Sequence, residues 1–363
     1  MVPPMHPDAP LAGPLQGYRR LELHMGVEFE VVVYAPDQAT AERALDAAFA
    51  RIAELDRRLS DYDPASELSQ LSLSTSPPRR EPGMPPQPVP VGRDLWEVLA
   101  FAQQMSEATQ GAFDVTIGPL TRLWRSARRR RELPDPAELA QARAAVGYQA
   151  LTLDRAGRRV TLHKSQMRLD LGGIAKGYAA DEAVRAVQGC GLARVLVRAS
   201  GDIATADPPP SETGWLVGVA PLDPEEPPQR MLLLTHRAVS TSGDARQHLV
   251  VGGRRYSHIL DPRTGEPVHG RSSVTVIAPL GMLADSLATA CSVVGPEEAL
   301  RLVARFPGSE LLMVHEDEQG RRTQVESPGF WAYEAPSDVV RSALDAAPPR
   351  RPPADHPPPK NGK

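Results

Sequence analysis

The middle of the chain holds the stretch that decides the fold, Leu169-Asp170-Leu171-Gly172-Gly173-Ile174-Ala175-Lys176-Gly177-Tyr178-Ala179-Ala180-Asp181. It predicts a strand over 167–171, a glycine pair, and a helix that continues to about Gln188. Glycines let the backbone approach a ligand closely, and a helix N-terminus with Lys176 in its first turn favours a phosphate group. The spacing is neither that of the dinucleotide fingerprint nor that of the P-loop, so a plain structural turn is an equal interpretation.

Predicted strands and helices surround this stretch in mixed order. A strand over 21–34 has one apolar face, a helix follows from Asp37 to about Leu59, and another helix covers 94–109. Further strands are predicted at 151–154, 160–163, 194–197, 215–219, 231–234, 248–251, 255–260, 273–278 and 311–315, and further helices at 283–294 and 296–305. Mixing without strict alternation favours an α+β fold, with mixed sheets and packed helices, over a doubly wound sheet.

Composition limits the class of protein. The 363 residues are 41% hydrophobic and 24% charged, which is enough to bury a core. The net charge of −4 disfavours a nucleic-acid-binding protein. The 38 prolines gather at 3–14, 77–90, 208–228 and 348–359, where they predict tails and loops. We therefore expect disordered proline-rich tails at 1–20 and 336–363 around one domain at 21–335.

The sequence also carries expectations about compartment and cysteine chemistry. No stretch of 18 apolar residues exists, so no membrane span is predicted. Residues 1–20 have neither an apolar signal region nor an early cysteine, so the chain as given is expected in the cytoplasm, or exported if its start site is mis-assigned. Cys190 and Cys291 are too few for a disulfide framework, and each is expected to be a buried inert thiol.

Three further segments carry candidate chemistry. Asp285 and Thr289 are four residues apart and share a helix face, where their hard oxygen atoms suit Mg²⁺ or Ca²⁺. The alternative is that Asp285 caps the helix and Thr289 bonds to its own backbone. His258 stands before the turn Asp-Pro-Arg-Thr-Gly, but a lone histidine is usually structural.

Two other patterns have weaker interpretations. The Ser-Gly-Asp triplets at 200–202 and 242–244 lie at strand ends and could aim carboxylates at a ligand, although each is more often a turn. The basic run at 125–131 predicts a solvated helix end, with a phosphate or acidic partner as the alternative.

Taken in order along the chain, seven segments resemble the ApbE family of FAD:protein FMN transferases. They are Met-Gly at 25–26, Ser-Asp-Tyr-Asp-Pro-Ala-Ser-Glu-Leu at 60–68, Gly-Ala-Phe-Asp-Val-Thr at 111–116, Asp-Leu-Gly-Gly-Ile-Ala-Lys-Gly-Tyr-Ala at 170–179, Ser-Gly-Asp at 242–244, Ser-His-Ile-Leu-Asp-Pro-Arg-Thr-Gly at 257–265 and Ala-Asp-Ser-Leu-Ala-Thr-Ala at 284–290. Any one of them could arise by chance, whereas seven in order are specific.

The resemblance implies a reaction and a site. A threonine or serine hydroxyl of an acceptor protein attacks the FMN phosphorus of FAD, AMP leaves, and Mg²⁺ sits on the pyrophosphate, in a cleft between two subdomains. It implies that Asp285, Thr289 and the backbone carbonyl of Gly173 hold the metal and that His258 is the base. The implied FAD contacts are Met25, Tyr62, Ala112, Phe113, Asp114, Asp170, Lys176 and Ile259.

The chain departs from the family pattern at two places. Val27 stands where the family usually has threonine, and Arg-Ala-Ser-Gly-Asp at 198–202 stands where the family usually has Asn-Leu-Gly-Gly before Asp or Asn. Two other functions fit the same residues: an Mg²⁺-dependent FAD pyrophosphatase, in which water replaces the acceptor hydroxyl, and a non-catalytic FAD-binding protein. The expected partners are FAD and the acceptor protein, with no nucleic acid.

Overall fold

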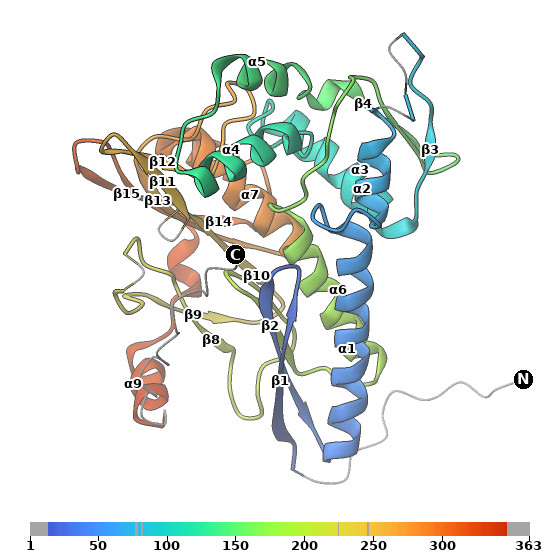
Figure 1. Cartoon of the computed structure of the whole chain (residues 1–363). Coiled ribbons are helices and arrows are strands. Elements are labelled where there is room, and N and C mark those ends of the chain that lie inside the picture. The colour runs from blue at the N-terminus through green and yellow to red at the C-terminus, as the bar shows by residue number, and fades with distance from the viewer. Residues whose placement is uncertain (1–13, 77–78, 81–82, 224, 245–246, 347–363) are drawn as a thin grey trace, which may run out of the picture.

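The computed structural model of the protein describes residues 14–76, 79–80, 83–223, 225–244 and 247–346 (Figure 1). Residues 1–13 and 347–363, which make up most of the two expected tails, lie outside the described residues. The remaining parts of those tails were predicted wrongly. Strand β1 begins at Gln16, and helix α9 covers Ser337–Ala346.

An eight-stranded antiparallel sheet forms the centre of the molecule. Its strands, in order across the sheet, are β1 (Gln16–His24), β2 (Val27–Ala35), β6 (Val195–Ala199), β7 (Asp202–Thr205), β10 (Ala238–Gly243), β13 (Arg271–Ala278), β14 (Glu310–Glu316) and β15 (Arg322–Glu326). Side chains alternate between the two faces of such a sheet. Val195 and Val197 accordingly join the core cluster under the helices, while Leu196 joins the cluster on the other face.

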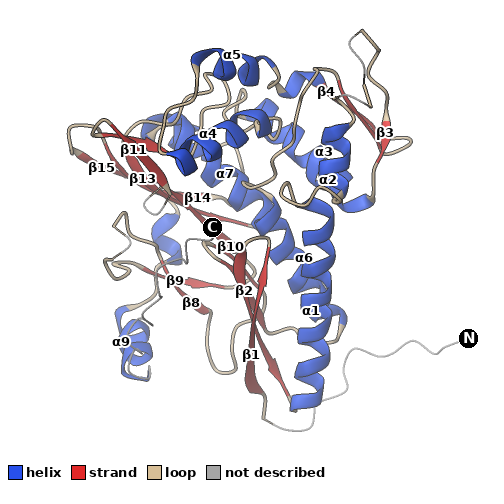
Figure 2. Cartoon of the chain, viewed as in Figure 1, coloured by secondary structure: helices blue, strands red, loops and turns tan. Residues whose placement is uncertain are grey.

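Long helices cover one face of the sheet, and a small hairpin covers the other (Figure 2). The helices are α1 (Gln38–Leu59), α6 (Ala175–Gly189), α7 (Gly281–Val294) and α8 (Pro296–Val303), and the hairpin is β8 (Trp215–Gly218) with β9 (Met231–Leu234). Helix α1 begins at its N-cap Asp37, whose carboxylate accepts a hydrogen bond from the Thr40 amide at 2.7 Å. Its buried positions recur at helical spacing.

A second, smaller core lies apart from the large one. Helix α4 (Gly118–Arg130), helix α5 (Pro136–Ala144) and the hairpin of β11 (His248–Val251) and β12 (Arg254–Ser257) carry residues that pack together here, among them Leu120, Trp124, Leu249 and Leu260. The other elements are α2 (Glu67–Leu73), α3 (Arg93–Ala108) and the sheet β3–β5–β4, made of Val89–Pro90, Arg159–Leu162 and Leu151–Asp154.

The α+β class is confirmed, as are the predicted helices and the hairpin at 151–163, each with small shifts in its ends. The expectation of mixed sheets is wrong, because every strand pair among the described residues is antiparallel. Residues 21–34 are not one strand, because the chain reverses at Met25 and Gly26, which have φ angles of 49° and 74°. The segment 167–171 is not a strand either. Its bridge from Arg168 to Ile117 is isolated. Met167, Leu169 and Leu171 are buried, but they do not form a ladder with another strand.

Several elements were not predicted, namely α5, β7, β10 and β15, and of α4 only the end within the basic run at 125–131 was expected. Cys291 is buried as expected, and burial raises the pKa of its thiol, but Cys190 is exposed because it lies at the C-cap of α6. Within the described ranges, no helix is long and apolar enough to span a membrane.

Candidate functional site

The site is built where helices α6 and α7 cross. A Cβ atom on Gly177 would lie 2.1 Å from the Gly281 carbonyl oxygen, and one on Gly281 would lie 2.5 Å from the Gly177 oxygen. The two backbones are therefore in direct contact. Asp181 joins the helices further, because its carboxylate accepts hydrogen bonds from the Gly281 and Met282 amides at 2.8 and 3.1 Å. This crossing sets the first turn of α6 against the first turn of α7, and Gly173, just before α6, lies against Thr289 further along α7.

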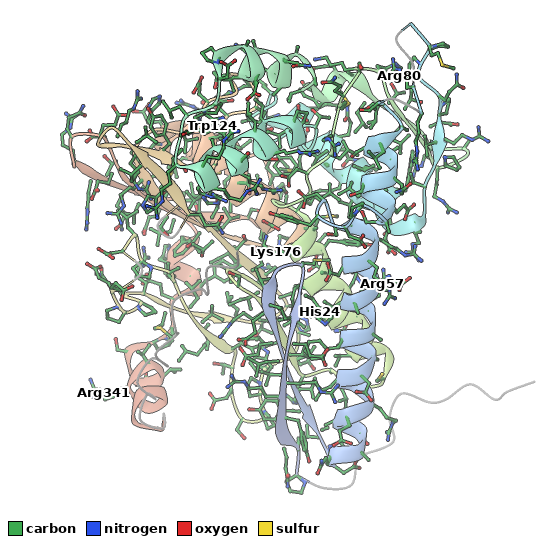
Figure 3. All side chains as sticks on the ribbon, viewed as in Figure 1. His24, Arg57, Arg80, Trp124, Lys176 and Arg341 are labelled. Carbon is green, nitrogen blue, oxygen red and sulfur yellow. The ribbon has the colours of Figure 1, made fainter. Side chains whose placement is uncertain are left out.

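A buried charge cluster lies at the crossing, around Lys176 at the start of α6 (Figure 3). The Lys176 Nζ atom is 3.0 Å from an Asp202 carboxylate oxygen, 3.4 Å from Asp285 Oδ2 and 2.9 Å from the Gly172 carbonyl oxygen. Asp202 and Asp285 are each only 4% exposed. Burial and the neighbouring Asp202 raise the pKa of Asp285 to about 7. Burial works against the ammonium charge, but the two carboxylates outweigh it and raise the pKa of Lys176.

The residues implied as metal ligands come together beside this cluster. A Cβ atom on Gly173 would lie 2.8 Å from Thr289 Oγ1, so the glycine backbone and the threonine hydroxyl are adjacent. Asp285 lies on the same face of α7, one turn before Thr289. The alternative that Asp285 caps its helix is wrong, because α7 begins at Gly281 and Asp181 bonds its first amides.

This donor set suits a hard cation. A carboxylate, a hydroxyl and a backbone carbonyl are the oxygen ligands that Mg²⁺ prefers. Nowhere in the described part of the chain do three or more His, Cys, Asp or Glu side chains gather as a metal site. The set therefore fits a cation that takes its remaining ligands from water and substrate phosphates rather than from a cage of protein side chains.

His258 follows strand β12 and has a defined tautomer. Its Nδ1 atom lies 3.0 Å from the backbone oxygen of Gln247. A carbonyl oxygen only accepts hydrogen bonds, so Nδ1 carries the proton and Nε2 keeps its lone pair. Burial lowers the pKa of His258, against a smaller opposing effect of Asp244, and this keeps the ring neutral near pH 7. Asp244 itself is buried in an ion pair with Arg255.

Tyr62 lies on an ion-pair network that leads to the charge cluster. Its ring is 73% exposed, and the Arg125 guanidinium carbon lies 4.7 Å from the ring centre. Arg125 pairs with Asp61 and, at 2.8 Å, with Asp170. The other Asp170 oxygen accepts a hydrogen bond from the Gly172 amide at 2.8 Å. Arg125 is thus part of the site, which corrects its interpretation as a solvated helix end.

The loop at 112–114 is buried, and the Asp114 carboxylate accepts its hydrogen bonds from neighbouring protein groups. One Asp114 oxygen accepts from the Thr116 amide and hydroxyl at 2.8 and 2.7 Å, and the other accepts from the Tyr148 amide at 2.8 Å. Ala112 and Phe113 are 1% and 4% exposed. The three residues therefore expose almost none of their surface in this structure, backbone included.

Met25 and Ile259, two of the expected FAD contacts, are far apart in the sequence. Met25 forms the tip of the β1–β2 hairpin, and its amide donates to Asp56 at 2.9 Å. Phe29 of this hairpin pairs with Ala199, which pairs with Asp202, so the tip lies at the same sheet end as the charge cluster. Ile259 is buried next to His258.

Asp202 is the member of the cluster that the sequence reasoning did not select. It belongs to one of the two Ser-Gly-Asp triplets, so the signal was present but was shared by many turns. The segment at 198–202, which differs from the family pattern, still supplies Asp202 to the cluster. Its first residue, Arg198, forms an ion pair with Glu30 on the neighbouring strand at 3.1 Å. Asp202 is also bonded to Ser240 on β10, whose end leads to Asp244 and the His258 region.

Comparison with known proteins identifies the class to which this fold and site belong. Residues 25–313 match the model of the ApbE family, and the chain belongs to this family.

Individual relatives agree with that assignment. The FAD:protein FMN transferase of Klebsiella pneumoniae is 31% identical, with 85% of this chain and 87% of that protein aligned. The FAD:protein FMN transferase of Salmonella typhimurium is 34% identical over 68% of this chain and 71% of that protein. The crystal structure of the Thermotoga maritima ApbE protein superposes with a TM-score of 0.76 at 30% identity, covering 88% of this chain and 100% of that one.

Proposed function

We propose that this protein is an FAD:protein FMN transferase. Membership of the ApbE family and similarity to named transferases over most of the chain support the activity. The observation that carries the proposal at the site is the meeting of Lys176, Asp285, Thr289 and Gly173 at the crossing of α6 and α7. A cluster of this kind can receive a pyrophosphate and its counter-cation.

In the reaction, a threonine or serine hydroxyl oxygen of the acceptor forms a bond to the FMN phosphorus of FAD. The bond from that phosphorus to the bridging oxygen breaks, and AMP leaves with that oxygen. The hydroxyl proton goes to a base. Such a transfer depends on alignment and charge neutralisation more than on covalent help from the enzyme.

We assign the base to His258. Its Nε2 atom has a free lone pair because Nδ1 donates to Gln247, and its lowered pKa keeps it able to accept a proton near pH 7. The second core, which carries His258, and the large core, which carries Asp285, are the natural candidates for two subdomains around a central FAD cleft.

Mg²⁺ is the cation we infer for the site. Asp285, Thr289 Oγ1 and the Gly173 carbonyl would hold it, and their hard oxygen atoms fit it. When bound, it supplies positive charge that offsets the negative charge of the pyrophosphate. Lys176 adds a second positive charge from the protein, held in place by Asp202.

The remaining family contacts would hold FAD along the site. Arg125 holds Asp61 and Asp170, so the Tyr62 ring and the Gly172 amide have fixed positions on the flank of the cluster. Met25 and Ile259 would supply apolar contact.

The test is a reaction of purified protein with FAD, Mg²⁺ and a candidate acceptor protein. We expect AMP and covalently bound flavin to form in equal amounts, and both to fail when the metal is chelated. AMP release at the same rate without acceptor would identify an FAD pyrophosphatase instead. FAD binding without AMP release under any condition would identify a non-catalytic FAD-binding protein.

A further inference from the structure

A cavity of about 440 Å³ lies between α4, α5 and the segment at 166–168. Three arginines line it: Arg122 and Arg130 from α4, and Arg168 from the segment that leads into the glycine pair. Among the described residues that line it, Glu138 is the one acidic side chain, so three positive charges face one negative charge there. The volume lies within the roughly 300–1,000 Å³ of small-molecule sites.

The cavity arginines differ from Arg125, which also belongs to α4. Arg125 is held by Asp61 and Asp170, whereas Arg122, Arg130 and Arg168 make no ion pair or side-chain hydrogen bond with any described residue. Arg168 is half-buried, and both its burial and the charge of Arg122 lower its pKa. Since an arginine keeps its charge, the folded protein holds two like charges near each other, and no described carboxylate forms an ion pair with either of them.

The walls of the cavity are held firmly. A Cβ atom on Gly118 would lie 2.7 Å from the Arg168 carbonyl oxygen, and Ile117 bridges to Arg168. The start of α4 is thus fixed against the backbone of Arg168. Arg122, Ser126 and Arg130 follow one another at four-residue spacing on α4 and line the cavity, whereas Arg125 pairs with Asp61 and Asp170. None of the described residues that line the cavity is a residue assigned to the transfer site. The cavity is therefore separate from the transfer site.

We propose that this cavity binds an organic phosphate of nucleotide size. Guanidinium groups match phosphate oxygens in geometry and charge, and three of them converge here. Pro119 and Leu123 give the cavity an apolar side that an inorganic ion would leave uncovered. The phosphate faces the arginines, and the organic part lies on the apolar side.

The test uses AMP, with adenosine as the phosphate-free probe. Binding is measured by calorimetry on the wild-type chain, on Arg122→Gln/Arg168→Gln, and on the matched control Arg129→Gln/Arg155→Gln, which removes two exposed arginines outside the cavity. We expect the AMP dissociation constant to rise at least about tenfold in the cavity variant and to stay within about twofold in the control. Adenosine should bind none of them measurably.

Stability gives a second readout. Removing the unpaired Arg168 relieves repulsion, so the cavity variant without ligand should melt about 1–2 °C higher than the wild type. If that variant does not fold, Arg122→Gln alone replaces it, because Arg122 lies at an exposed position. We expect this single substitution to weaken AMP binding by about threefold. Equal AMP affinity in all variants, or adenosine binding as tightly as AMP, would overturn the proposal. FAD affinity is measured in parallel, and it should not change.

Discussion

One hydrogen bond fixes the tautomer of His258. The contact of Nδ1 with the Gln247 carbonyl leaves Nε2 as the proton acceptor, and burial keeps the ring neutral. A general base contributes about 10²- to 10⁴-fold to a rate. We therefore expect His258→Gln to lower kcat for flavin transfer by about that factor, with the FAD dissociation constant nearly unchanged. The exposed His236, replaced in the same way, serves as the control.

The pH profile tests the same residue independently. Acidification protonates Nε2 and removes the base, so activity falls as pH drops through the His258 pKa. Since burial lowers that pKa, the acid limb should have its midpoint below the ordinary value of about 6.5. A His258→Gln variant that turns over at full speed but binds FAD weakly would show that the ring only contacts the flavin or adenine.

Asp285 is expected to be needed for metal binding but not for folding. Its carboxylate is buried beside Asp202 and Lys176, where loss of one negative charge leaves Lys176 still paired with Asp202. Asp285→Ala should abolish Mg²⁺-dependent AMP release while the circular dichroism spectrum stays the same. Activity that survives at saturating Mg²⁺ would contradict the assignment.

At the scale of elements, the crossing of α6 and α7 decides the site geometry. A Cβ on Gly177 would clash with the Gly281 carbonyl at 2.1 Å, so Gly177→Ala must push the two helices apart. We expect the variant to lose about 1–3 kcal/mol of unfolding free energy in urea denaturation. It should also bind Mg²⁺ more weakly, because Asp285 moves away from Gly173.

Gly189 provides the matched control on the same helix. A Cβ there would meet nothing within 4 Å, and Gly189 is the last residue of α6. Gly189→Ala should therefore leave Mg²⁺ affinity unchanged and cost no stability, since alanine is the better helix former by about 0.5–1 kcal/mol. Equal effects of the two substitutions would mean that the close crossing is not what positions the site.

At the scale of the whole molecule, the residues expected to contact FAD come from both cores. Tyr62 and Lys176 lie around the large core and its ion-pair network, whereas Ile259 follows the hairpin of the second core. An FAD molecule that contacts residues of both cores gains binding energy from both its flavin half and its AMP half. Calorimetry should therefore show FMN binding at least about tenfold more weakly than FAD, a difference of ~1.4 kcal/mol. Equal affinities would place the whole binding energy on the flavin half.

The sequence by itself determined the local structure and the candidate residues. Helical spacing predicted α1, α3, α6 and α7, because one apolar stripe per helix is a property of neighbouring residues. The α+β class followed from the mixed order of elements. The family motifs named Asp285, Thr289, Gly173 and Lys176, which the structure brings together.

Only the tertiary structure decided how these pieces meet. It placed Asp202 against Lys176, joined Arg125 to Asp61 and Asp170, and turned 21–34 into a hairpin. It also placed the arginine cavity apart from the residues assigned to the transfer site, none of which is among the described residues that line it. Periodicity reports on residues a few positions apart, while the ion pairs of Lys176 with Asp202 and of Arg125 with Asp61 and Asp170 join residues 26 to 64 positions apart. Their energies come from burial and charge pairing that exist only after the sheet and helices have packed.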